Sequence, residues 1–126
     1  MIYKLESKKD FDTVAKDLEE AAKRNKFGVL KVHDVKETIT SKGVEFSMDC
    51  KIIEICNPLK AKQVLEANPD ISSALPCRVS VYRDKGNVTL ATIKPTALLS
   101  MFPNPELKAV AEEVEAAIVK IMNEAA

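Results

Sequence analysis

The sequence has little of several residue types on which particular functions depend. It contains no Trp, two Tyr, one His and three Gly in 126 residues. Scarce aromatic residues argue against a surface that stacks nucleic-acid bases, and three scattered glycines do not form a phosphate-binding loop. The single histidine, His33, leaves one candidate base for a serine or cysteine triad. We therefore expect no catalytic set of these kinds.

Neither sign of charge is in excess. Nineteen basic residues face nineteen acidic ones, so the formal net charge is zero, whereas nucleic-acid-binding domains usually carry a basic surface. No apolar run approaches the ~20 residues that cross a membrane, and the first residues lack the apolar stretch of a signal peptide. We expect a cytoplasmic protein with no nucleic-acid or membrane partner. Its three cysteines are then expected to be free thiols.

The residues that are present suit a globular domain. Hydrophobic residues make up 46% of the chain and charged residues 30%, a balance typical of folded domains. Helix-like and strand-like patterns are mixed along the chain. They predict a single α+β domain over residues 1–126, with a two-layer, mostly antiparallel sheet of about five strands and helices packed on one face.

Five segments have the alternation typical of strands, namely residues 2–6, 27–33, 46–56, 77–83 and 88–93. The last two are joined by a turn sequence at residues 84–87, which predicts a hairpin. In the second strand Leu30 and Val32 are expected to share a face. In the third, Ile52 and Ile53 are both apolar, so either both faces are covered or a bulge lies near Ile52.

Helical spacing of apolar residues predicts helices after Ser7, Asn57, Lys94 and Asn104. Asn57 and Asn104 precede prolines and are expected N-caps, and Ser7 is the expected cap of the first helix. Residues 34–42 are ambiguous, because Asp34 suits a helix cap while Thr38-Ile39-Thr40 favours a strand. The last helix is expected to lie on the sheet, the alternative being a coiled-coil seam.

Cys56 and Cys77 are the residues most suggestive of chemistry. Cys56 ends one predicted strand directly before the cap Asn57, and Cys77 begins another. If these strands are neighbours, the thiols lie close together. The partial positive charge of a helix N-terminus is expected to lower the pKa of Cys56, and a thiol pair suits redox exchange or a soft metal. The alternative is that both are small buried hydrophobes.

Three further residues are candidates for binding. Arg78 and Lys51 are cations that an anion near the helix N-terminus at Pro58 would meet, although strand residues on an outer face are also charged simply because they are solvated. His33 is a candidate third ligand in a metal site with the two cysteines. The alternative for His33 is a solvent-facing side chain at the end of its strand.

Several short segments occur in a characteristic order within residues 27–100, namely Phe27-Gly28-Val29-Leu30, Asp34-Val35-Lys36, Cys56-Asn57-Pro58 with Ala61, Leu75-Pro76-Cys77 with Val79 and Val81, and Pro95. With these segments, most of residues 27–100 resembles the bacterial and archaeal family called domain of unknown function 302. The resemblance implies a compact two-layer α+β fold and a dimer. It also favours a short helix within residues 34–42, and it implies no accepted activity.

Two functions follow as expectations. The first is a non-enzymatic cytoplasmic module that forms a homodimer through the sheet edge and the last helix, and that binds a small molecule beside Cys56, Asn57, Cys77 and Arg78. The alternative is a thiol-based redox or metal-handling protein that uses Cys56 and Cys77. The sequence assigns no catalytic residue and no cofactor.

Overall fold

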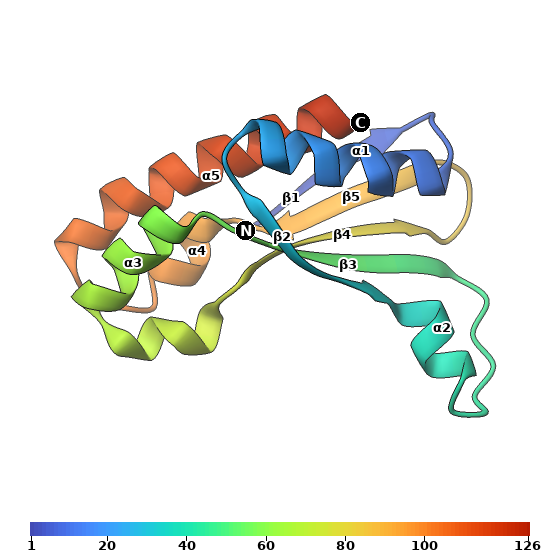
Figure 1. The fold of residues 1–126 in the computed structure, drawn as a ribbon, viewed down its shortest axis with the longest axis horizontal. Helices are drawn as coiled ribbons and strands as arrows, with labels where there is room; N and C mark the ends of the chain where they lie inside the picture. Colours follow the sequence, from blue (N-terminus) through green and yellow to red (C-terminus); the bar gives the residue numbers. More distant parts are fainter.

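The computed structural model describes residues 1–126 and contains one five-stranded antiparallel sheet, in the order β1-β5-β4-β3-β2 (Figure 1). The strands are β1 (Ile2–Ser7), β2 (Gly28–Asp34), β3 (Asp49–Cys56), β4 (Cys77–Arg83) and β5 (Val88–Ile93). The helices are α1 (Phe11–Arg24), α2 (Val35–Thr40), α3 (Pro58–Ala67), the 3-10 helix η1 (Pro69–Ala74), α4 (Pro95–Leu99) and α5 (Pro105–Ala125). The predicted α+β class is confirmed.

Helices α1 and α5 lie side by side on one face of the sheet and enclose the main core (Figure 1). Leu18 and Ile118 point from the two helices into this core, and Ile53, Val79 and Leu90 point up from the sheet; all five are fully buried. Apolar residues at intervals of three and four give each helix one such face. The last helix therefore lies on the sheet, as expected, because its apolar stripe is buried there.

A second, smaller core lies at the end of the sheet, where α3, η1 and α4 gather around the beginning of α5 (Figure 1). Val64, Ile71 and Leu107 form its buried centre. These three residues belong to α3, η1 and α5. The 3-10 helix η1 precedes Pro76 and contributes Ile71 to this core.

The strand β2 contains a bulge that changes the predicted faces. Its register against β3 shifts between Val29 and Lys31, so Leu30 is the extra residue, and its side chain is 61% exposed. Val29 and Val32 both pack against the main core. The expectation that Leu30 shares a face with Val32 is wrong, because one inserted residue reverses the alternation.

Of the two alternatives left open for Ile52 and Ile53, the bulge is absent. The strand β3 pairs with β4 without a shift from Asp49 to Ile55. Ile53 is fully buried against the helices, and Ile52 lies half-buried on the opposite face. The strand also begins at Asp49 rather than at Phe46, and Asp49 accepts hydrogen bonds there from lysine and arginine side chains.

Two local predictions about helix starts have different outcomes. The cap of α1 is Asp10, whose Oδ1 accepts from the backbone N–H of Thr13 at 2.9 Å. Ser7 is not the cap, because it still belongs to β1 and its buried hydroxyl donates to the carbonyl of Ala126 at 3.0 Å. Residues 35–40 form a helix capped by Asp34, which accepts from the N–H of Glu37 at 3.1 Å.

The other face of the sheet, here called the open face, has no helix across its middle (Figure 1). Ile52, Ser80 and Ala91 lie opposite one another on the three central strands of this face. All three are uncharged and half-buried. None of the helices combines the length and the apolar character that crossing a bilayer requires.

Candidate functional site

The two cysteine-bearing segments lie next to each other in the sheet. Ile55 of β3 pairs directly with Cys77 of β4, so Cys56 and Cys77 sit at the same end of the strand pair. The prediction that these strands are neighbours is confirmed. Antiparallel pairing accounts for this, because it sets the last residue of one strand beside the first residue of the next.

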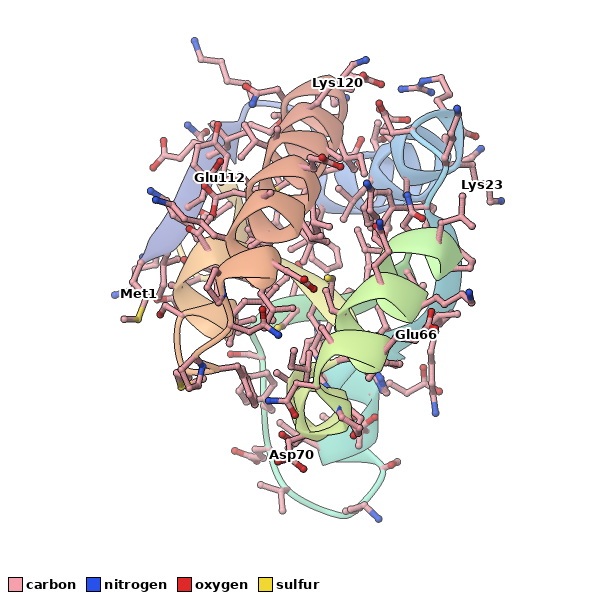
Figure 2. The ribbon with its side chains drawn as sticks, turned by 90° about the vertical axis from the view of Figure 1, so that its left-hand side faces the viewer. Met1, Lys23, Glu66, Asp70, Glu112 and Lys120 are labelled. Atoms are coloured by element: carbon pink, nitrogen blue, oxygen red, sulfur yellow. The ribbon has the colours of Figure 1, made fainter.

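A cavity of about 350 Å³ lies at this end of the sheet. The helices α3 and α4, which border it, are on the side of the molecule that faces the viewer in Figure 2. Its walls come from the sheet, α3, η1, α4 and α5. Cys56, Asn57, Cys77 and Arg78, the residues predicted to lie at a ligand site, all line it. Most other lining residues are hydrophobic, including Ala61, Val64, Leu75, Leu98, Leu99 and Phe102.

The cavity lies between the two cores. Ile55 and Ile118 line it and belong to the main core, whereas Val64 lines it and belongs to the smaller one. The short helix α4 and the 3-10 helix η1 border it. A mostly apolar hollow of this kind is typical of small-molecule sites.

Asn57 shapes the cavity wall through the backbone. Its Oδ1 accepts from the N–H groups of Leu59 at 3.1 Å and Lys60 at 3.3 Å, and Pro58 occupies the first helical position. The predicted cap is confirmed. The cap fixes where α3 begins, and therefore where Cys56 ends its strand and meets the cavity.

The thiols of Cys56 and Cys77 are weak acids in this setting. Burial raises the pKa of Cys56, so the expectation that the helix N-terminus lowers it is wrong. Burial, and then charge on Cys56, raises the pKa of Cys77 to about 11, against a smaller opposing effect of Arg78. Asn57 already occupies two N–H groups of α3, which leaves less positive potential for a thiolate. All cysteines are free.

Arg78 belongs to an ion-pair group on the open face. Its Nε lies 3.4 Å from Oε2 of Glu54, and Nε2 of His33 lies 3.4 Å from Oε1 of the same carboxylate. His33 is thus engaged on this face rather than with Cys56 and Cys77. No group of three or more His, Cys, Asp or Glu side chains is arranged to hold a metal ion.

Lys51, the other predicted anion-binding residue, lies elsewhere. Its Nζ is 3.6 Å from Oδ1 of Asp12 and 5.5 Å from the centre of the Phe11 ring. It lines a second, polar cavity that also contains Asp34 and Cys50. Burial, and then the charge of Asp34, raises the pKa of Cys50. This cavity contains side chains that already pair with each other, such as Asp49 and Arg83.

The sequence interpretation missed Lys60. Lys60 lines the cavity beside Cys56 and Cys77, and its Nζ pairs with the carboxylate of Glu113 on α5. The sequence feature that could have identified Lys60 is its position four residues before Val64, because residues four apart share a face of a helix. A cation within an otherwise apolar helical stripe indicates a boundary between core and solvent.

The fold and the cavity together define a two-layer α+β domain with a mostly apolar pocket at one end of its sheet. The family model for the domain of unknown function DUF302 matches residues 3–125. The crystal structure of an uncharacterized conserved DUF302 protein from Bacillus stearothermophilus has 32% sequence identity and a TM-score of 0.94, over 99% of this chain and 98% of that one. This chain therefore belongs to the DUF302 family. No curated protein matches it.

Proposed function

We propose that this protein is a binding module that holds a small, largely apolar molecule in the cavity beside Cys56 and Cys77. The observation that carries the proposal is the cavity of about 350 Å³ between the two cores. Ligand pockets range from roughly 300 to 1,000 Å³ and combine apolar walls with a few polar groups. The three free cysteines favour a reducing compartment such as the cytoplasm.

The character of the walls favours binding over thiol chemistry. A redox cysteine or a soft-metal ligand acts as a thiolate, and its pKa is usually lowered. The pKa values of Cys56 and Cys77 are both raised by burial. Protonated thiols behave as small, polarizable hydrophobes, which suits the wall of an apolar pocket.

A cavity-filling variant tests the binding proposal. Ala61 is half-buried and lines the cavity, so Ala61→Phe is expected to occupy the space that a ligand needs. Ala109→Phe is the control, because Ala109 is exposed on α5 and does not line the cavity. In NMR titrations with octanol, the wild-type protein and Ala109→Phe are expected to show shifts at Cys56 and Cys77. Ala61→Phe is expected to show none.

Two results would contradict the binding proposal. One is shifts that lie away from the cavity in the wild-type protein. The other is an unchanged octanol affinity in Ala61→Phe, provided that the backbone spectrum shows the variant to be folded.

The protein is also proposed to form a homodimer through the open face. The uncharged side chains of Ile52, Ser80 and Ala91 lie in a row across the central strands. Sheet faces of this kind commonly pack against another layer. The open face also carries the charged residues Arg78, Glu54 and His33, but these pair with one another beside the uncharged row. The outer face of α5 is less suited to an interface, because it carries exposed charged residues such as Glu112 and Lys120 (Figure 2). Because the formal net charge is zero, two copies carry no net charge that would oppose their association.

A further inference from the structure

The charged side chains that line the cavity beside Cys56 and Cys77 are all positive. Lys60 and Arg78 are the only charged residues that line it. No carboxylate lines it, because the acidic partners of these two cations, Glu113 and Glu54, lie outside the lining. An apolar hollow bordered only by cations is complementary to a molecule with an apolar body and a negative group.

Both cations remain accessible to such a group. The Arg78 side chain is 54% exposed and the Lys60 side chain 31%. Arg78 donates to Glu54 through Nε, at 3.4 Å, and its terminal nitrogens donate no hydrogen bond within the chain. A guanidinium presents five N–H donors in a fork that fits a carboxylate. The terminal nitrogens can therefore hold an anionic head without breaking the pair with Glu54.

The thiols at the cavity wall do not oppose an anion. Cys56 and Cys77 line the same cavity, and burial keeps the pKa of each above its ordinary value. At neutral pH both are uncharged, so they neither repel a negative head nor attract a positive one. Among the lining side chains only Lys60 and Arg78 carry charge, and each is paired with a carboxylate outside the lining.

We infer that the ligand is an amphipathic anion, with a hydrocarbon tail in the cavity and a carboxylate or similarly small anionic head at Lys60 and Arg78. This inference rests on the proposed function, because it assigns the chemistry of the molecule held in the same cavity. The size of the cavity limits the tail to a short or medium chain, and the charge at the rim selects the head.

Three ligands with the same tail separate the contribution of the head from that of the tail. Octanoate, octanol and octylamine are titrated into the wild-type protein at neutral pH, and binding is followed by calorimetry and by NMR shifts at the cavity residues. Octanoate is expected to bind about tenfold more tightly than octanol, because a hydrogen bond to a charged group is worth more than a neutral one. Octylamine is expected to bind most weakly.

The outcomes distinguish the two proposals. If octanol or octylamine binds as tightly as octanoate, the anionic head is wrong, while the apolar cavity remains a binding site. If none of the three binds at the cavity, both the inference and the proposed function are overturned.

Charge-removing variants locate the head group. Lys60→Gln and Arg78→Gln are each expected to weaken octanoate binding several-fold and to leave octanol binding unchanged. Lys62→Gln is the matched control, because Lys62 lies on the same helix, pairs with Glu66 at 3.1 Å and does not line the cavity. An equal loss of octanol and octanoate affinity in the two rim variants would overturn the assignment of the head group.

Discussion

Cys77 begins its strand directly beside the end of the strand that carries Cys56. The two are close enough that charge on Cys56 raises the pKa of Cys77, yet burial is the larger effect on each. Proximity of two thiols is commonly associated with redox chemistry. In this protein burial makes both thiols harder to ionise, and the nearby Cys56 adds to that effect at Cys77.

The first prediction concerns the reactivity of these thiols. A pKa of about 11 for Cys77 leaves roughly one thiol in a thousand ionised at pH 8. Alkylation by iodoacetamide, followed residue by residue with mass spectrometry, is expected to be slow at pH 8 and to accelerate toward pH 11. Cys56 is expected to titrate above the ordinary cysteine range of ~8.5. A titration midpoint of Cys56 below that value would support the thiol alternative instead.

The second prediction concerns the cap that places α3. Asn57→Ala removes the acceptor for the N–H groups of Leu59 and Lys60, and losing an N-cap typically costs about 1 kcal/mol. The free energy of unfolding in urea is expected to fall by that amount. Asn57→Asp keeps an oxygen acceptor and is expected to stay near the wild-type value. Equal losses in both variants would mean that the cap is not what stabilises this turn.

The third prediction concerns the homodimer. Ala91→Arg places a cation in the middle of the open face, whereas Ala109→Arg places one on the exposed face of α5. Light scattering after size-exclusion chromatography is expected to show a wild-type dimer, a monomer for Ala91→Arg and a dimer for Ala109→Arg. Dissociation of Ala109→Arg alone would move the interface to the last helix. A wild-type monomer at micromolar concentration would contradict the dimer.

The fourth prediction concerns stability in acid. The hydrogen bond from Lys36, with its charge and that of Arg83, lowers the pKa of Asp49. A carboxyl with a lowered folded pKa stabilises the protein above its unfolded pKa of ~3.9, and this stabilisation is lost as the pH falls through the folded value. Asp49→Asn is therefore expected to have a lower Tm than the wild type at pH 7. The difference is expected to shrink toward pH 2.

Asp84→Asn is the control for this pH dependence. Asp84 is exposed in the hairpin turn and forms no ion pair, so its replacement is expected to leave the Tm nearly unchanged at both pH values. A difference between Asp49→Asn and the wild type that stays constant from pH 7 to pH 2 would show that the ionised carboxylate is not the cause.

Short-range patterns determined much of this protein. A cap residue followed by proline predicted where α3 and α5 begin, and alternation predicted β4 and its hairpin with β5. These features depend on hydrogen bonds between residues close in the chain and on which face of a strand or helix each residue occupies. A few consecutive residues are therefore enough to predict them. The prediction that Cys56, Asn57, Cys77 and Arg78 lie together came from the same source, since strands ending and starting with the same signals suit one antiparallel pair.

Only the folded chain decided the rest. The bulge at Leu30 depends on which β3 residues stand opposite. The pKa of Cys56 depends on how far its sulfur is buried. Lys60 meets Arg78 at one cavity only because α3 folds back over the end of the sheet. Register, burial and the juxtaposition of distant charges are sums over residues far apart in the chain. No local sequence pattern predicts these properties, because the packing of the whole domain sets them.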